Sequence, residues 1–559
     1  MDKSNIYQKI KPLFPLKYKS NRLPEYLSFL FSVLDKKIHG KDLARIPGQW
    51  GKESYKKLAD KYSQIPTECA DPLAKCGEIT TDLFGGIPRW RSPNLQYNVG
   101  AAVNTAAAAV YSLALDENIY NINDGLAGNA LVAEQAVSAI LANLANVTTP
   151  AHGLFTFGGT ATNLYALKIG TRKAAPDSGK RGMPKNLKVA LTKDAHFSHG
   201  VSADWLGIGT DNVIVMEPDL DRSSNLAGAE SKMRTTLEQG NLLAAIIING
   251  GTTYGHVIDD IQAFVELRDK LVRDYSLPYK PHLHVDSVIG WAWLMFKDYD
   301  FDKNELNIED EALEKIEKQY KKISKINSAD SWGVDFHKGV GACPIDCSIV
   351  MMNDVSDFVL LSKKENPITA MHQLAQEFSF TSPADFTLET SRSGGAALAA
   401  LASLHTLGVK GYQRNLANLV QETTLTKKLL SVEKDVMICD RDSLGYVTMI
   451  RFYPPELNND SRKFSEFTDK STEIKDFVEK VNNYTKAFFQ WDLAVRMSKN
   501  KQLEYSFSSN YLDLPCGGKL SAIKLYPVSP HFDEEHARET VQILLEQKRL
   551  FDTTAWIKR

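Results

Sequence analysis

The stretch that decides the fold reads Ser331-Trp332-Gly333-Val334-Asp335-Phe336-His337-Lys338. Its first half is short and apolar, which indicates a buried strand, and its second half ends in polar side chains. Upstream, another apolar run closes on His284-Val285-Asp286. In open sheets of parallel strands, ligands bind where the strands end. We therefore expect Lys338 and Asp286 to lie at one edge of a sheet, around one ligand.

Further short apolar runs alternate with helical patterns between about 150 and 360, at 154–157, 187–191, 213–215, 244–248 and 348–352. Their β-branched content and brief length favour a buried, mostly parallel sheet covered by helices. The run from Gly100 to Leu115 predicts a buried, Ala-rich helix. The charged segment from Asp300 to Lys325 predicts an exposed helix inserted on the surface.

Three parts of the chain are expected. The first, 1–95, is rich in Lys, Tyr and Pro and predicts a helical N-terminal segment. The second, 96–405, carries the sheet and forms the large domain. The third, 406–559, combines strand patterns with a final amphipathic helix, which predicts a small C-terminal α/β domain.

Composition limits the class of protein. The chain has 559 residues, of which 43% are hydrophobic and 24% are charged, with a formal net charge of −2. These values fit a globular protein of two or three domains and give no sign of nucleic-acid binding or of a membrane anchor. The N-terminus lacks the apolar core of a signal peptide. The six cysteines form no C-x-x-C pair, so we expect free thiols and a cytoplasmic location.

Three loops that follow strands carry candidate binding groups. Gly158-Gly159-Thr160 leads into a helix, where backbone N–H groups can approach an anion, although such a turn is also an ordinary helix start. His196 could stack on a planar ring or be structural. Thr252, in a glycine loop, could offer its hydroxyl to a ligand oxygen or simply close the loop.

Asp286 and Lys338 carry the most specific chemistry. A carboxylate that ends an apolar strand needs a partner, and a protonated pyridine nitrogen is a suitable one. A lysine beside a poorly solvated pocket can form a Schiff base. The pair therefore predicts pyridoxal 5'-phosphate (PLP) as cofactor. The alternative is a metal hydrolase, because His282, His284 and Asp286 share one strand face, but no further ligand cluster is present and we expect no metal.

In their order along the chain, these features resemble the group II PLP-dependent amino-acid decarboxylases. That family includes the glutamate, aromatic-amino-acid, tyrosine and aspartate decarboxylases. The resemblance covers roughly residues 90 to 415 and, more loosely, the C-terminal part. It rests on Gly158 to Thr160, His196, 250–253, 284–286, 335–338 and Thr390-Ser391-Arg392. It implies an α/β protein of PLP fold type I, the aspartate-aminotransferase-like fold.

The resemblance also implies roles by position. Lys338 would form the Schiff base, Asp286 would hold the pyridinium N–H, and His196 would stack on the ring. The cofactor would further be held by Gly158, Gly159, Thr160, His337 and Thr252. Arg392 would bind a substrate carboxylate or form a structural salt bridge. The family builds its sites between two subunits, which implies a homodimer embraced by the N-terminal segment.

The chain departs from the family pattern in four respects. Val288 occupies a position where the family usually has alanine, and the charged segment lengthens the link from Asp286 to Lys338. The family's cysteine after the lysine comes one residue late, at Cys347. No tyrosine occurs between Tyr320 and Tyr412, although the family commonly uses a loop tyrosine as general acid. His372, in the equivalent loop, is the candidate replacement.

The predicted reaction is the α-decarboxylation of an L-amino acid to the amine and carbon dioxide. An acidic substrate is favoured because Arg91 and Arg392 are available, and an aromatic one stays open. The alternatives are an aldehyde synthase that couples decarboxylation to oxidation, a PLP-dependent carbon–carbon lyase, and a PLP-binding scaffold without turnover.

Overall fold

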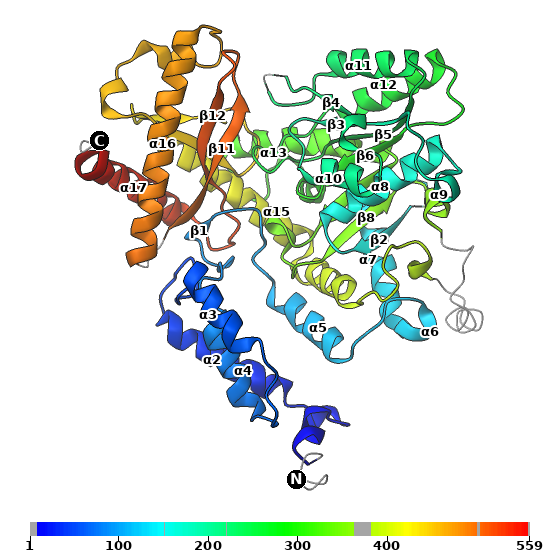
Figure 1. Cartoon of the computed structure of the whole chain (residues 1–559), viewed down its shortest axis with the longest axis vertical. Coiled ribbons are helices and arrows are strands. Elements are labelled where there is room, and N and C mark those ends of the chain that lie inside the picture. Colours follow the sequence, from blue (N-terminus) through cyan, green and yellow to red (C-terminus); the bar gives the residue numbers. More distant parts are fainter. Residues whose placement is uncertain (1–7, 150, 220, 363–381, 500–502, 557–559) are drawn as a thin grey trace.

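The computed structural model describes residues 8–149, 151–219, 221–362, 382–499 and 503–556. Figure 1 shows three parts: a helical N-terminal arm, a large α/β domain around one sheet, and a C-terminal domain with its own sheet.

The large domain is built on a seven-stranded sheet in the order β2-β8-β7-β6-β5-β3-β4. The strands are β2 (His152–Thr156), β3 (Leu187–Thr192), β4 (Val213–Met216), β5 (Leu242–Asn249), β6 (His282–Asp286), β7 (Ser331–Asp335) and β8 (Ser348–Met352). Strand β8 runs antiparallel to β2 and β7 on its two sides, and the other neighbouring strands of this sheet are parallel. All seven apolar runs of the sequence are strands, so the mostly parallel sheet is confirmed.

Helices cover this sheet and carry the loops of the site. They include α7 (Leu131–Leu144), α8 (Gly159–Ala174), α10 (Ser198–Trp205), α11 (Leu226–Glu238), α12 (Ile261–Asp274) and α13 (Asp310–Ile323). Helix α8 lies across β5 to β8 and is buried over most of its length (Figure 1). Because α8 begins directly after β2, its first turn is held at the edge of the sheet where the parallel strands end.

Two of the helical predictions need correction. Helix α5 (Thr105–Asp116) packs on α15, but Leu113 and Leu115 are 55% and 54% exposed, so the prediction of a buried helix was wrong. Helix α13 exists as predicted, but it is not exposed all round. Its residues Ala312, Ile316 and Ile323 are fully buried, since they recur at helical spacing among the charges.

The C-terminal domain contains a five-stranded sheet in the order β1-β11-β12-β10-β9. Its strands are β1 (Leu95–Gln96), β9 (Val436–Ile438), β10 (Thr448–Phe452), β11 (Glu504–Asp513) and β12 (Lys519–Leu525), and its long helices are α16 (Thr472–Lys499) and α17 (Glu534–Phe551). Strand β1 pairs in parallel with β11. The end of the N-terminal segment is therefore part of the C-terminal sheet.

Helix α15 (Gly395–Ser431) joins the large and C-terminal domains. At Gly408 the backbone leaves the helical region, with φ 60° and ψ 173°, so α15 is two helices joined at an angle. Glycine adopts this conformation at little steric cost, because it has no Cβ. The expected boundary between 405 and 406 falls within α15, just before this break.

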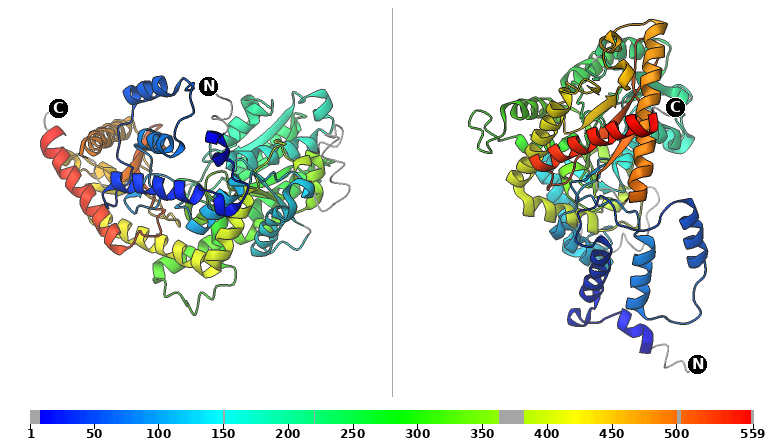
Figure 2. Two further views of the ribbon diagram at one scale, coloured as in Figure 1. Left: turned by 90° about the horizontal axis from the view of Figure 1, so that it is seen from below. Right: turned by 90° about the vertical axis from the view of Figure 1, so that its left-hand side faces the viewer.

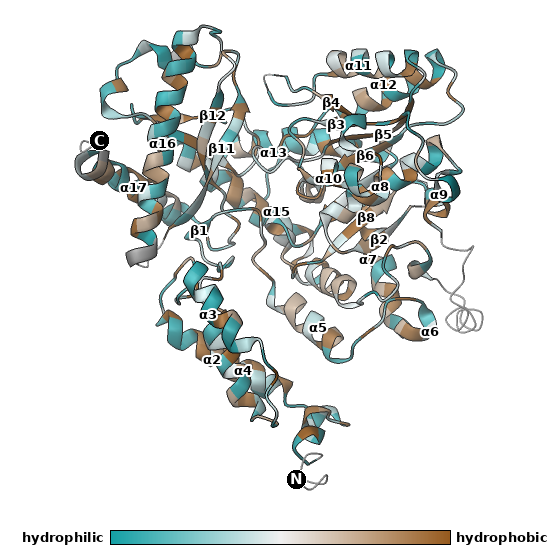
Figure 3. Ribbon diagram, in the orientation of Figure 1, coloured by the Kyte–Doolittle hydropathy of each residue, from teal (hydrophilic) through white to brown (hydrophobic). Residues whose placement is uncertain are grey.

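The N-terminal arm projects away from the rest of the molecule (Figure 1 and Figure 2, right). Its helices are α2 (Leu23–Ile38), α3 (Lys52–Tyr62) and α4 (Pro72–Leu83). Hydrophobic segments appear on this arm in Figure 3, and Phe14 and Phe31 are 75% and 61% exposed. An arm with so much apolar surface is typical of a segment that packs against another chain.

One helix of the described residues, Asp124–Leu144, is long and apolar enough to cross a bilayer by length and composition. Its α7 part nevertheless belongs to the core of the large domain. Val137 and Leu141 are fully buried, and the Ser138 hydroxyl accepts a hydrogen bond of 3.0 Å from the Gly153 N–H of β2. These contacts explain its apolar character by packing.

Candidate active site

Lys338 follows β7 and is held at both flanks. The Gly339 N–H donates to the Val99 carbonyl at 2.8 Å, and the Ala101 N–H donates to the His337 carbonyl at 3.1 Å. The Lys338 Nζ lies 2.8 Å from Oδ2 of the fully buried Asp335. Burial alone would lower the pKa of the amine, but the charge of Asp335 outweighs it and raises that pKa above its ordinary value. The amine is therefore a protonated, paired group here.

Asp286 ends β6 and is an ionised carboxylate, one oxygen of which accepts no hydrogen bond from the described residues. Its Oδ2 accepts hydrogen bonds from His199 Nε2 at 2.6 Å and from Asn163 Nδ2 at 3.2 Å. Burial would raise its pKa, but the His199 bond and the charge of Lys338 hold that pKa well below the usual range. Its Oδ1 is buried and has no hydrogen-bond partner among the described residues. A buried, unpaired carboxylate oxygen is costly unless a ligand supplies a donor.

His196 lies in the turn before α10. Its Nδ1 is 2.8 Å from the Ser198 hydroxyl. Partial burial and the positive charge of Lys338 lower the pKa of the imidazole, so the ring is neutral near pH 7. A neutral, partly open imidazole can cover the face of an aromatic ring.

The Gly158-Gly159-Thr160 turn presents the beginning of α8. The N-cap residue Gly158 has φ 132°, and no described side chain caps the helix. A Cβ at Gly159 would lie 2.6 Å from Asp335 Oδ2, so only glycine fits between the turn and that carboxylate. Thr160 is exposed beside these N–H groups. An uncapped helix start with a close-packed glycine is suited to a phosphate group.

Thr252 and His337 have more local contacts. The Thr252 hydroxyl accepts a hydrogen bond of 3.1 Å from the Val257 N–H, which closes the glycine loop. His337 Nε2 lies 3.8 Å from Asp335 Oδ2, and its Nδ1 lies 3.4 Å from the Ser348 hydroxyl. His337 therefore borders the lysine pair, whereas the Thr252 hydroxyl is engaged within its own loop.

Arg392 adopts the structural alternative. Its guanidinium is buried, pairs with Glu134 Oε2 at 2.8 Å, and donates to the carbonyls of Phe155 and Asn121. Arg91 is exposed and donates to the Val103 carbonyl. Arg392 is thus engaged in a structural ion pair, and Arg91 has no described contact with the residues around Lys338. His372 lies outside the described residues.

Lys524 on β12 is a candidate that the sequence reasoning missed. It is 6% exposed, its Nζ donates to Asn98 Oδ1 at 3.0 Å, and it lies 5.2 Å from the centre of the Tyr254 ring. No carboxylate of the described residues pairs with it, and burial lowers its pKa to about 8. Asn98 adjoins Val99, which holds Gly339, so Lys524 approaches the lysine segment from the C-terminal domain. A single lysine in a strand gives no signal in a sequence.

The histidines of the metal alternative point elsewhere. His282 Nε2 and His284 Nδ1 both lie 2.7 Å from the Ser331 hydroxyl on the neighbouring strand. Within the described ranges, no group of three or more His, Cys, Asp or Glu side chains is arranged to hold a metal ion. The geometry therefore favours the ring-binding interpretation of Asp286.

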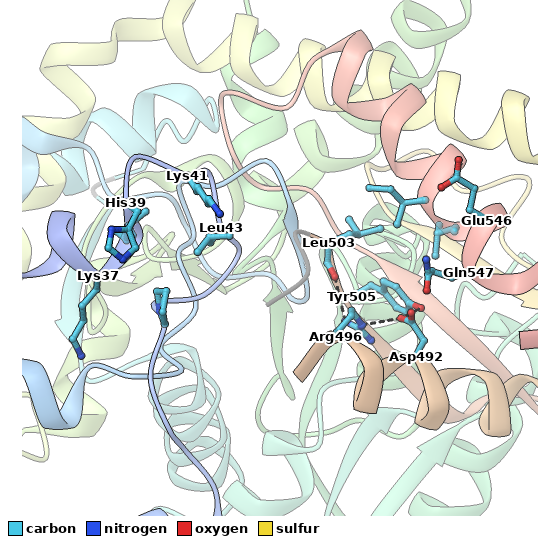
Figure 4. Close-up of a pocket in the computed structure, with 14 residues that line it drawn as sticks. Lys37, His39, Lys41, Leu43, Asp492, Arg496, Leu503, Tyr505, Glu546 and Gln547 are labelled. Carbon is cyan, nitrogen blue, oxygen red and sulfur yellow. Dashed lines mark hydrogen bonds and ion pairs between the residues drawn. The ribbon is translucent and has the colours of Figure 1, made fainter. Parts of the chain in front are cut away.

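A cavity of about 830 Å³ lies apart from these residues, between the loop after α2 and the C-terminal helices α16 and α17 (Figure 4). Its polar wall includes Arg496, which pairs with Asp492 at 2.8 Å and Glu504 at 3.2 Å. None of the predicted site residues lines it. Size alone does not identify a reactive site, and the unpaired groups around Lys338 identify one better.

The residues around Lys338 fit PLP. The free oxygen of Asp286 suits a ring N–H, the uncapped start of α8 suits a phosphate, and Lys338 suits an aldehyde. Asp286 and Lys338 are close enough that each shifts the pKa of the other. The structure thus brings together groups that are separated by about fifty residues in the chain.

Comparisons with known proteins agree with this fit. A family model described as the pyridoxal-dependent decarboxylase conserved domain matches residues 53–450. L-2,4-diaminobutyrate decarboxylase of Rhizobium meliloti (strain 1021) is 25% identical over 391 residues, which span 67% of this chain and 71% of the relative.

Among solved structures, mouse CSAD in apo form has a TM-score of 0.74 at 16% identity and covers 94% of this chain and 98% of its own. Oryza sativa TDC with PLP and tryptamine has a TM-score of 0.76 at 14% identity, with coverages of 96% and 99%. These likenesses confirm the predicted fold class over almost the whole chain.

Proposed function

Because the chain belongs to the pyridoxal-dependent decarboxylase family and is a PLP-dependent amino-acid decarboxylase, we propose that Lys338, Asp286 and His196 form its catalytic centre. The observation that carries this proposal is the buried Asp286 carboxylate, ionised and with Oδ1 unpaired, within electrostatic range of a lysine. Burial of an unpaired carboxylate oxygen is costly, and a ring N–H of the cofactor would offset that cost.

When bound, PLP supplies an aldehyde that captures amines and a ring that accepts electrons from the breaking bond. Asp286 Oδ1 would hold the proton on the ring nitrogen, and His196 would cover one face of the ring. The first turn of α8, from Gly158 to Thr160, would bind the phosphate with its N–H groups. His337 borders this site, and the loop with Thr252 follows the end of β5.

Lys338 and Asp335 are placed to exchange a second proton, that of the lysine amine. Nζ and Oδ2 are 2.8 Å apart, so Asp335 is placed to take up the proton that the amine must lose before it reacts. The same pair can return that proton when the product amine leaves. The acid that protonates the substrate's α-carbon stays a prediction, with His372 as its candidate.

For the substrate, an acidic amino acid is our proposal, now supported by Lys524 in place of Arg392 and Arg91. A buried ammonium group whose pKa is lowered to about 8 by burial gains strongly from a carboxylate partner. Asn98 and Tyr254 hold it at the C-terminal-domain side of the lysine segment. An aromatic substrate would leave this charge without a partner.

The test is a reconstituted protein whose yellow absorbance disappears in Lys338→Ala, combined with carbon dioxide release from a panel of amino acids. We expect the highest kcat/KM for an acidic substrate and a preferential loss of that activity in Lys524→Met. Aldehyde and peroxide are measured in parallel, since their formation would identify the oxidative alternative, and cleavage without carbon dioxide would identify a lyase.

A homodimer is also proposed. The exposed apolar residues of the arm and of α5, including Phe14, Phe31, Leu113 and Leu115, would be covered by a second subunit. Light scattering of the purified protein should give twice the chain mass, and a monomer at micromolar concentration would refute it. A cytoplasmic location is supported by the six cysteines, all of which are free, and cell fractionation tests it.

A further inference from the structure

We propose that His199 is a positioning residue that orients the Asp286 carboxylate and keeps it charged, so that only Oδ1 is offered to the cofactor. This inference rests on the proposed function, because it assigns His199 a role through Asp286. His199 is three residues beyond His196, on the first turn of α10.

The contact is short and fully enclosed. His199 is 2% exposed, and its Nε2 lies 2.6 Å from Asp286 Oδ2. Among the described residues its Nδ1 has no partner, so within that part of the chain the bond to Asp286 is the hydrogen bond that orients the ring. Hydrogen bonds to an ionised acceptor are among the stronger ones in proteins.

The arrangement distinguishes the two carboxylate oxygens. Oδ2 receives His199 and Asn163, whereas Oδ1 receives no described donor. Without His199, Oδ2 would keep only the Asn163 bond of 3.2 Å, and burial would favour the protonated form of Asp286. A carboxyl group that is protonated or free to rotate cannot hold a ring proton in one place.

Asn163 connects this contact with the rest of the site. Its Nδ2 is within 3.3 Å of the Gly159 carbonyl and 3.5 Å of the Ser198 hydroxyl, and that hydroxyl also contacts His196 Nδ1. The phosphate-binding turn, the residue proposed to cover the ring and the Asp286 carboxylate thus share one hydrogen-bond network. A substitution of His199 would remove the hydrogen bond to the buried Asp286 carboxylate from this network.

Other ionisable groups face Asp286, but none contacts it directly. His284, on the same strand, is bonded to Ser331, and burial lowers its pKa to about 3. Lys338 and His196 act from the open side of the site. Among the ionisable groups of the described residues, His199 is the one that donates to the carboxylate.

The experiment uses the purified full chain and measures the dissociation constant of PLP by its absorbance, without turnover. We expect His199→Leu to weaken PLP binding about tenfold or more, the value of one hydrogen bond to a charged group. His199→Gln keeps a donor at similar reach and should bind nearly as wild type, while His199→Asn is too short and should resemble the leucine variant. His282→Gln is the matched control, because it removes a buried imidazole of β6 that has no contact with Asp286.

A second readout is the pH at which the absorbance of the bound cofactor changes. In His199→Leu and His199→Asn this pH should move upward. If Asp286 no longer keeps the ring nitrogen of PLP protonated, a positive charge near the nitrogen that joins Lys338 to PLP is lost, and the pKa of that nitrogen rises. A merely structural role for His199 would lower the thermal midpoint and leave this titration unchanged.

The decisive comparison is made in Asp286→Asn. If His199 acts through Asp286, adding His199→Leu to that variant should cost no further affinity. Additive losses, or wild-type affinity and titration in both His199→Leu and His199→Asn, would overturn the inference. An unchanged affinity in Asp286→Asn alone would instead refute the proposed role of Asp286. Should His199→Leu not fold, the contrast between His199→Gln and His199→Asn decides the matter.

Discussion

The substitution Lys524→Met should make the cofactor-free protein more stable and a worse enzyme. Methionine keeps the length and the apolar stem of lysine but carries no charge. Because Lys524 is buried and has no carboxylate partner among the described residues, its ammonium group works against folding. Its structural neighbour Asn98 is exposed and can bond to water instead, so the loss there is small.

The magnitude follows from the pKa. The difference between about 8 in the fold and the ordinary 10.5 corresponds to about 3 kcal/mol of penalty for the charged form. In the unfolded chain the Lys524 amine keeps its proton to higher pH than in the folded one, so the free energy of unfolding rises with pH between about 8 and 10.5. The penalty is complete below pH 8, shrinks between 8 and 10.5, and is absent above that range.

The assay is thermal unfolding of wild type and Lys524→Met without cofactor, over a series of pH values. We expect the variant to melt a few degrees higher at pH 7 and the advantage to shrink as the pH rises above 8. In parallel, KM for an acidic amino acid should rise at least tenfold, the effect of losing one charged partner. A variant that melts lower than wild type at pH 7, or a difference independent of pH, would refute the assignment of an unpaired charge.

Three further changes test the surroundings of the site. Glu134→Gln should lower the thermal midpoint, because it leaves the Arg392 guanidinium buried without its counter-charge at a cost of about 3 kcal/mol. If KM is unchanged in this variant, Arg392 stabilises the fold and does not bind the substrate. Gly159→Ala should reduce PLP affinity measured by titration, since its Cβ would lie 2.6 Å from Asp335 Oδ2, whereas Gly200→Ala, with open space around it, should bind PLP normally. Asp335→Asn removes the charge that raises the pKa of Lys338, so the reactive neutral amine should form at lower pH. PLP uptake, followed by absorbance, should then extend to lower pH, and an unchanged pH profile would argue against proton exchange between Lys338 and Asp335.

The large sheet could be predicted because each of its strands is a contiguous apolar run between turns. The C-terminal sheet could be predicted only in part. Strand β1 pairs with β11, so Leu95 lies beside Glu504, and no local pattern encodes a contact over such a separation. The exposed face of α5 was missed because an Ala-rich run gives no sign of which of its sides packs on another helix.

The site divides in the same way. Lys338 and Asp286 stand in recognisable surroundings, so their shared position could be predicted from spacing and strand order. His199 and Asn163 could not, because their importance comes from one buried oxygen that they reach from other elements. For Arg392, the sequence left two alternatives, and only the position of Glu134 distinguishes them.

The break in α15 has a mechanical consequence. Two torsion angles of Gly408 set the direction in which the chain leaves the large domain, and β12 with Lys524 lies on the far side of that pivot. A change of a few degrees in those angles would displace the far end of the helix that follows more than its near end. The position of β12 and Lys524 relative to the large domain therefore depends in part on the backbone of a residue that has no side chain.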